Sequence, residues 1–432
     1  MTTPNGSNSP SRRDFLKTSS AAALSGAAIS SLAFPAGVHA GVDDVIKIGL
    51  VGCGGRGTGA STDCLTADAK TKIVAMGDAF ADRLNGSHGE LSKKFKERVD
   101  VPEDRRFVGF DAYQKVIDSG VDLVILATPP GFRPIHFAAA VEAGKHVFME
   151  KPVATDAVGV RKVLEATKKA KERGLGVGVG LQRHHQAMYI DVIKRLQDGA
   201  IGDINSMRAY WNSNGVWVRP RQPGQTDMEY QVRNWYYFNW LCGDHICEQH
   251  IHNLDVINWL KNAYPINCEA MGGRQVRVEE KYGEIYDHFA CEYEYADGSR
   301  MFSYCRHQEN TWGSVSEHAA GSKGTADINQ GVIRVKGGEE YRYRGKNDGN
   351  PYVVEHHDLL TSIRNSAPLN EGENGAHSTL TAILGRMAAY SGKKVTWEQA
   401  LNSELNLQPA KYSWDAEAPK VVVATPGVTK AF

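Results

Sequence analysis

The sequence predicts an α/β protein: a doubly wound parallel sheet, followed by a C-terminal α+β domain built on a large, open, mainly antiparallel sheet. Three observations support this fold class. A glycine-rich turn at residues 52–57 follows an apolar, β-branched run at 46–51. Strand-like and helix-like segments then alternate to about residue 173, as in βαβ units. From residue 267 to 333, apolar and polar side chains alternate with period two, as in an antiparallel sheet with one solvated face.

The glycine-rich turn has the pattern G-x-G-x-x-G, which is a weak signal when it stands alone. Here its setting strengthens it. The run before it resembles a strand buried on both faces, and residues 56–65 can open a helix whose N-terminal amides and dipole hold a pyrophosphate. We therefore expect a dinucleotide to be bound by Gly52, Gly54, Gly55, Arg56 and Gly57.

A carboxylate ends the second predicted strand. The apolar run at residues 72–76 leads to Asp78, about twenty residues past the last motif glycine, where dinucleotide-binding folds place the acid that binds the adenosine ribose. The alternative is an ordinary turn residue. Because Asp78 would meet a 2′-phosphate with like charge, we expect NAD; NADP stays the alternative, since Arg83 lies close by in sequence.

Two further predicted strands, at residues 121–127 and 145–150, end in polar motifs. Ligands of parallel sheets lie beyond the carboxyl ends of the strands. Lys151 at that edge indicates hydride transfer, because an ammonium can stabilise the charge that develops on a reacting oxygen. The alternative is that Lys151 is an ordinary surface lysine. The expected rim collects the glycine turn, Asp78, Thr128, Pro129, Glu150 and Lys151.

The first forty residues resemble a twin-arginine export signal. Arg12-Arg13 is followed by Phe-Leu-Lys, then by a stretch of small residues that ends at Ala40. The stretch is too short and too poor in large apolar residues to be a stable membrane span. We expect export of the folded protein to the periplasm without a membrane anchor in the mature form; a disordered tail is the alternative.

Composition excludes several other classes. The 50 acidic and 50 basic residues balance, and no basic run stands out, so nothing favours nucleic acid or an anionic membrane as a partner. The seven cysteines lack zinc-ribbon or CxxC spacing, and we expect them to be small buried apolar residues. The expected partner is a small molecule.

The chain divides into four expected parts. These are a signal at residues 1–40, a dinucleotide-binding domain at 45–173, a substrate domain at 174–401 and an extended tail at 402–432. Two helices near the end of the third part, at about 353–365 and 376–391, are expected to close the substrate domain.

The most chemically distinctive segment of the substrate domain reads as one helix over residues 242–260. Glu248, His252 and Asp255 stand at i, i+4 and i+7 on it and form one polar stripe on a largely apolar helix. Such a stripe lines a cleft or faces water. A metal site is not expected, because no H-x-x-x-H pair is present in this segment.

A lysine and a histidine suit the oxidation of a carbinol. Histidine titrates near neutrality and can accept the hydroxyl proton, and a lysine ammonium stabilises the developing alkoxide. Beside the polar stripe, Trp235 and Tyr236 either stack on the CH face of a sugar ring or belong to the core, and the sequence leaves both readings open.

From Val45 to about Leu401 the sequence resembles the Gfo/Idh/MocA family of sugar and polyol dehydrogenases, typified by glucose-fructose oxidoreductase and inositol dehydrogenase. The resemblance rests on the glycine turn, on Glu-Lys-Pro at 150–152, and on a D-x-x-x-H-x-x-D helix in which Glu248 replaces the first Asp. It implies that Lys151 and His252 are the catalytic pair, that Glu248 and Asp255 assist with substrate, and that Gln182 and Arg183 lie near the nicotinamide.

Three functions stay open. The first is an exported NAD(P)-dependent oxidoreductase acting on a sugar, glycoside or cyclitol. The second has the same site but traps the nicotinamide, so that the overall reaction is redox-neutral. The third is a periplasmic carbohydrate-binding protein without turnover. An open sheet face also predicts a homo-oligomer, either a dimer or a tetramer.

Overall fold

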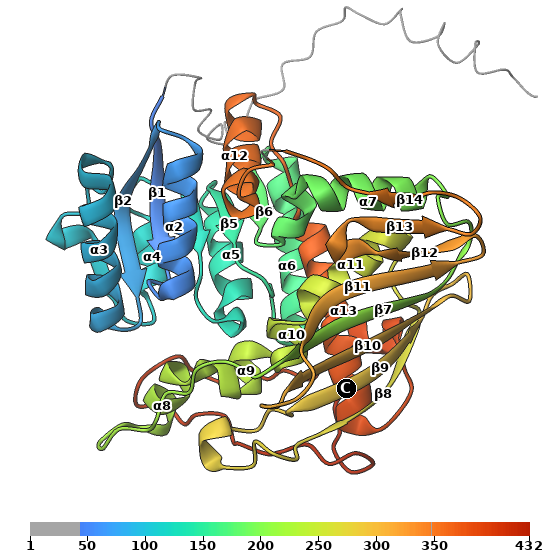
Figure 1. Cartoon of the computed structure of the whole chain (residues 1–432). Helices are drawn as coiled ribbons and strands as arrows, with labels where there is room; N and C mark the ends of the chain where they lie inside the picture. The colour runs from blue at the N-terminus through green and yellow to red at the C-terminus, as the bar shows by residue number, and fades with distance from the viewer. Residues whose placement is uncertain (1–43, 347) are drawn as a thin grey trace, which may run out of the picture. The chain divides into compact units, whose positions relative to one another are not determined.

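A computed structural model describes residues 44–346 and 348–432. The expected export signal at residues 1–40 lies outside the described residues. Two sheets organise the described chain, and we take them in order along the sequence (Figure 1).

The first sheet is the predicted doubly wound parallel sheet. Its six strands lie in the order β3-β2-β1-β4-β5-β6, and every neighbouring pair is parallel. The strand order reverses beside β1, and ligands of such sheets bind at that switch point. The strands are β1 Ile46–Val51, β2 Thr71–Asp78, β3 Arg106–Val108, β4 Leu123–Leu126, β5 His146–Met149 and β6 Val177–Val179. The helices are α2 Gly55–Ala67, α3 Ala81–Phe95, α4 Ala112–Ile117, α5 Arg133–Glu142 and α6 Ala157–Glu172.

Strand β6 lies past the expected division at residue 173. It pairs in parallel with β5, so the parallel sheet runs to Val179. Helix α12 (Pro351–Arg364) also differs from expectation, because it does not close the substrate domain. Its Leu359, Leu360 and Ile363 share one buried cluster with side chains of β1 and β4, and Figure 1 shows α12 beside α2. The chain therefore returns to the first domain late in the sequence.

The second sheet has nine strands in the order β14-β13-β12-β11-β7-β10-β9-β8-β15. Only β7 and β10 pair in parallel among them, so the sheet is mainly antiparallel as predicted. A turn at Asp297-Gly298 joins β9 to β10, with Gly298 at a φ of 81°. The strands are β7 Ile204–Ser213, β8 Asn267–Gly273, β9 His288–Glu294, β10 Arg300–His307, β11 Ser314–Gly321, β12 Gly324–Asp327, β13 Val332–Val335, β14 Glu340–Arg342 and β15 Val395–Thr396.

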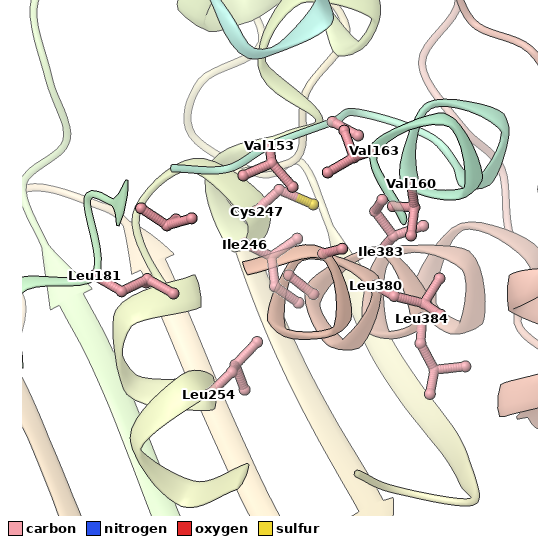
Figure 2. Packing of buried hydrophobic residues seen from close by; sticks show 14 of the residues in the cluster. Val153, Val160, Val163, Leu181, Ile246, Cys247, Leu254, Leu380, Ile383 and Leu384 are labelled. Carbon is pink, nitrogen blue, oxygen red and sulfur yellow. The ribbon is translucent and has the colours of Figure 1, made fainter. Parts of the chain in front are cut away.

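One continuous apolar core joins the two sheets. Figure 2 shows Val160 and Val163 of α6 facing Leu380, Ile383 and Leu384 of α13, with Ile246 and Leu254 beside them. Losing such a buried side chain to alanine typically costs about 2–5 kcal/mol. The remaining helices are α7 Ala187–Gln197, α8 Asp227–Arg233, α9 Asn239–Cys242, α10 His245–Glu248, α11 Ile251–Lys261, α13 Gly372–Ser391 and α14 Trp397–Leu401.

Residues 402–432 form no helix or strand, in line with the expected extended tail. They nevertheless make specific contacts with both domains, which matter for the cofactor groove below. Across the part of the chain that the structure describes, no helix is long and apolar enough to cross a membrane.

Candidate active site

The glycine turn connects the end of β1 to the start of α2. Gly52 has a φ of 95°, a region that side chains rarely adopt. A Cβ on Gly57 would stand 1.8 Å from the carbonyl oxygen of Gly52, so Gly57 allows the helix to pack on the turn. Gly54 and Gly55 have open space where a Cβ would project, and no acidic residue lies in the first turn of α2. This open helix N-terminus fits a dinucleotide pyrophosphate.

Asp78 stands at the end of β2, beside the turn. Its Oδ2 accepts from the backbone amide of Cys53 at 2.6 Å, and its Oδ1 accepts from that of Phe80 at 2.8 Å. Burial raises the pKa of this carboxyl above its usual value, although the two amides act to lower it. The amides fix its orientation, and each oxygen keeps a lone pair with which to accept a ribose hydroxyl.

Arg133 builds the rim after β4 and β5, a role that the sequence did not indicate. Its fully buried guanidinium donates to the carbonyl oxygens of Leu126, Thr128 and Glu150, which fixes the ends of both strands. Burial lowers the pKa of Arg133 to about 10. The Glu150 carboxylate accepts from Nε of Arg56, so the glycine turn and the strand end are joined by an ion pair.

Lys151 reaches from the rim to the second domain. Its Nζ donates to the backbone carbonyl oxygen of Glu248 and, at 3.1 Å, to Oε1 of the same residue. Each side chain of the pair is 11 % exposed. Burial raises the pKa of Glu248, and the neighbouring ammonium of Lys151 acts against that rise.

The expected continuous helix over residues 242–260 is wrong, and its interruption makes this contact available. Three helices, α9, α10 and α11, replace it. His252 donates its backbone N–H to Gln249 at 3.5 Å, whereas an unbroken helix would direct it to the carbonyl oxygen of Glu248. That oxygen is therefore left to accept from Lys151.

His252 lies at the start of α11 and lines the same cavity as Lys151. It is buried, its ring lies 6.0 Å from that of Trp211, and its Nδ1 has no hydrogen-bond partner among the described residues. Burial, reinforced by the positive charges of Lys151 and Arg183, holds the pKa of His252 well below its usual range. The ring is therefore neutral at physiological pH and free to accept a proton.

One cavity of about 480 Å³ joins these features. The lining residues include Gly52, Gly54, Gly55 and Arg56 of the glycine turn, together with Asp78, Thr128, Pro129, Glu150, Lys151, Glu248 and His252. Gly57 does not line the cavity. Trp235 and Tyr236 also line it, which places them at the site and not only in the core. Lining residues that sequence reasoning missed include Trp211, Trp217, Arg219 and Tyr352; the indoles and the guanidinium come from a strand and a loop that carry no motif.

Asp255 does not line the cavity, contrary to expectation. It points into a buried network instead: its carboxylate binds His184 at 2.8 Å, Ser378 at 2.8 Å and Asn374 at 3.1 Å. Burial acts to raise the pKa of Asp255, but His184 and the two hydrogen bonds lower it overall. Asp255 holds α11 against α13.

Gln182 and Arg183 also lie outside the cavity lining. Arg183 forms a buried ion pair with Glu317 of β11, so its charge is neutralised within the second domain. Gln182 donates to the hydroxyl of Tyr352 at 3.2 Å. Tyr352 lines the cavity, so Gln182 lies directly behind that lining residue. Gly180 is the residue of this segment that reaches the cavity.

No group of three or more His, Cys, Asp or Glu side chains in residues 44–346 and 348–432 could hold a metal ion. All seven cysteines are buried and free, as expected.

Residues 46–180 match the model of the Gfo/Idh/MocA family, described as an oxidoreductase family with an NAD-binding Rossmann fold. The match ends directly after β6. The parallel sheet is an NAD-binding Rossmann domain.

Known relatives extend the similarity. The inositol 2-dehydrogenase of Acidothermus cellulolyticus is 26% identical over 233 residues, which are 54% of this chain and 58% of that protein. The chain spans a little over half the length of the curated relatives it matches.

Solved structures share the whole fold. The aldose-aldose oxidoreductase of Caulobacter crescentus, complexed with glycerol, superposes with a TM-score of 0.63 at 20% identity, over 81% of this chain and 99% of that one. The scyllo-inositol dehydrogenase of Lactobacillus casei, with bound NAD(H) and scyllo-inositol, gives 0.63 at 21% identity, over 82% and 100%.

We predict that His252 stays neutral well below pH 6.5. Its low pKa follows from burial and the nearby cations, so protonation requires a lower pH than for an exposed histidine. Lys151→Met should move the pKa upward, because it removes one of those cations. Titration of the imidazole resonances by NMR tests this, with the exposed His357 as the reference signal. A titration midpoint of His252 at or above pH 6.5 would contradict the prediction that its ring is neutral in the folded protein.

Proposed function

We propose that this protein is an exported NAD-dependent oxidoreductase, acting as a homodimer or homotetramer, that transfers hydride between a secondary hydroxyl of a sugar, glycoside or cyclitol and the nicotinamide. The observation that carries the proposal is one cavity shared by the dinucleotide turn, Lys151 and His252. The inositol 2-dehydrogenases among the relatives support a cyclitol or sugar as the substrate class.

The chain's own residues suit this chemistry. Bound NAD would supply the hydride acceptor, held by the glycine turn and Asp78. Lys151 would donate a hydrogen bond to the carbinol oxygen, which stabilises the charge that grows there as the C–H bond breaks. The neutral ring of His252 would accept the hydroxyl proton. Glu248 holds the ammonium of Lys151 in place.

Aromatic side chains give the other end of the cavity a surface suited to a ring. Trp217 stands 5.6 Å from Trp235 and 6.2 Å from Tyr236, both edge to face. The hydroxyl of Tyr236 is buried without a partner among the described residues. The CH face of a sugar stacks on such rings while its hydroxyls meet the polar groups beside them.

A second candidate keeps the same site but retains the nicotinamide between half-reactions. The observation that favours it is a wall of the second domain that lines the groove in addition to Asp78 and the Rossmann rim, formed by Val216, Trp217, Arg219, Val232, Arg233, Trp235 and Tyr236. Hydride taken from one carbinol would then return to a carbonyl carbon of the same sugar or of a second one, and a proton would pass to that carbonyl oxygen. The substrates together would be neither oxidised nor reduced.

We expect His252→Asn and Lys151→Met to abolish most hydride transfer while the fold and nucleotide binding survive. A lost general base typically costs about a hundred- to ten-thousand-fold, and a lost charge donor a similar amount. The measurement is single-turnover reduction of bound NAD, followed by nicotinamide absorbance, across a panel of sugars and cyclitols.

Matched controls are the exposed residues His357 and Lys194, changed to Asn and Met in turn. Wild-type rates in either site variant would refute these roles. No absorbance change with any sugar in the native protein would favour a binding protein without turnover.

We expect NAD to bind at least about tenfold more tightly than NADP, because like charges in contact cost several kcal/mol. Asp78 is the source of this preference, so Asp78→Ala should narrow the difference, whereas Asp104→Ala, at an exposed site, should not. Calorimetry with both nucleotides decides it. Equal or tighter binding of NADP by the native protein would refute the role of Asp78.

Export follows from Arg12 and Arg13, with the mature chain beginning near Gly41. We expect the double change of Arg12 and Arg13 to lysine to leave the folded protein in the cytoplasm. Cell fractionation and N-terminal sequencing provide the readout. Undiminished export of the double variant would exclude the twin-arginine route.

A further inference from the structure

The adenosine end of the groove is bridged by residues that no comparison assigns to it. Phe80 and Phe110 line the groove beside Asp78. Arg233, at the end of α8, places its guanidinium 3.8 Å from the ring centre of Phe80. The same guanidinium donates to both carboxylate oxygens of Asp82 at 3.1 Å. The second domain is thereby fastened to the Rossmann domain across the groove.

The C-terminal segment reinforces the bridge from behind. Trp414 stands 4.3 Å from the ring of Phe110 and 5.1 Å from that of Phe80, measured between ring centres. Its carbonyl oxygen accepts from the hydroxyl of Thr226, which caps the N-terminus of α8. Trp414 therefore contacts both aromatic rings of the Rossmann rim with its indole and Thr226, the cap of α8, with its backbone carbonyl oxygen.

The segment is anchored on either side of this point. Before it, Leu407 donates its backbone N–H to Asp156 at 3.0 Å, and Gln408 donates to the carbonyl oxygen of Trp240 at 3.0 Å. After it, the backbone N–H of Val422 donates to Glu284 at 3.1 Å. Figure 1 shows this segment in dark red, passing α8 and α9. The anchors hold Trp414 against the rim from both directions.

We propose that residues 407–422, together with Arg233, form a clasp that closes the adenosine end of the groove and slows release of the dinucleotide. Adenosine held at Asp78 would lie between the Rossmann rim and the wall that carries Arg233, so it leaves only when the Arg233–Asp82 pair opens. Trp414 opposes that opening, because its indole packs on the two phenylalanines of the rim while its backbone carbonyl oxygen holds Thr226 at the start of α8.

The clasp rests on the proposed function only in that the groove holds a dinucleotide. Slow release also bears on the reaction. A reduced nucleotide that leaves slowly is more easily reoxidised while still bound than exchanged for a new one, which favours the redox-neutral candidate above. The clasp also gives a functional role to residues 407–422 and to Arg233, which lie outside the family motifs.

The experiment measures the dissociation rate of NADH by displacement with excess NAD, followed by nicotinamide fluorescence. Asp82→Asn breaks the ion pair from an exposed position, where 58 % of the side chain is accessible, and therefore leaves the core intact. Because an exposed ion pair and an aromatic contact are each weak, Asp82→Asn is combined with Trp414→Ala, and the double change should speed release on the order of tenfold. Trp414→Phe should restore part of the slow rate.

Controls use the same residue types away from the rim. Asp198→Asn breaks another exposed ion pair, with Lys194, and Trp312→Ala removes an indole that is 63 % exposed beside the second sheet. Both should release NADH at the native rate. Raised salt should speed release from the native protein, because it screens the ion pair, and should have less effect on Asp82→Asn.

The outcomes separate two failures. Tight binding with identical release rates in the native protein and in every variant would overturn the clasp and leave the oxidoreductase intact. Absence of NADH binding in all of them would overturn the proposed function itself. Faster release in the control variants as well would show a general loosening of the fold and would also count against the clasp.

Discussion

The contact between Lys151 and Glu248 is the constraint on which the site depends. A lysine at the edge of the Rossmann sheet would be costly to bury without a partner, and Glu248 supplies both a carboxylate and a free backbone carbonyl oxygen. That carbonyl oxygen is available only because the helix is interrupted between α10 and α11. The same interruption lies directly before His252, so one local break accompanies the meeting of Lys151 and His252 at the cavity.

Much of the fold was predictable because its signals are local. The buried strand before the glycine turn, the alternation of strands and helices, and the period-two pattern of the second sheet each depend on neighbours in sequence. The rim residues from Gly52 to Lys151 followed from them, since parallel strands place their carboxyl ends at one edge. The return of α12 to the first domain was not predictable, because its apolar residues do not specify which sheet they cover.

The predicted residues that lie outside the cavity have partners far away in sequence. Helical spacing put Asp255 on one stripe with Glu248 and His252, but the break between α10 and α11 separates Glu248 from the other two. Its carboxylate instead meets His184, Ser378 and Asn374, a set of partners spread over almost two hundred residues of sequence. Arg183 also lies outside the cavity lining, because it forms an ion pair with Glu317 on a strand far along the chain. Partners so distant leave no mark on the local pattern.

We propose that Lys151 and His252 bind the same substrate hydroxyl. A crystal structure of the protein with NAD and a cyclitol such as scyllo-inositol would show whether they do. We expect one ring hydroxyl within about 2.6–3.2 Å of both the ammonium of Lys151 and the imidazole of His252. A ring bound elsewhere in the cavity, with neither side chain in hydrogen-bond reach of any hydroxyl, would contradict it.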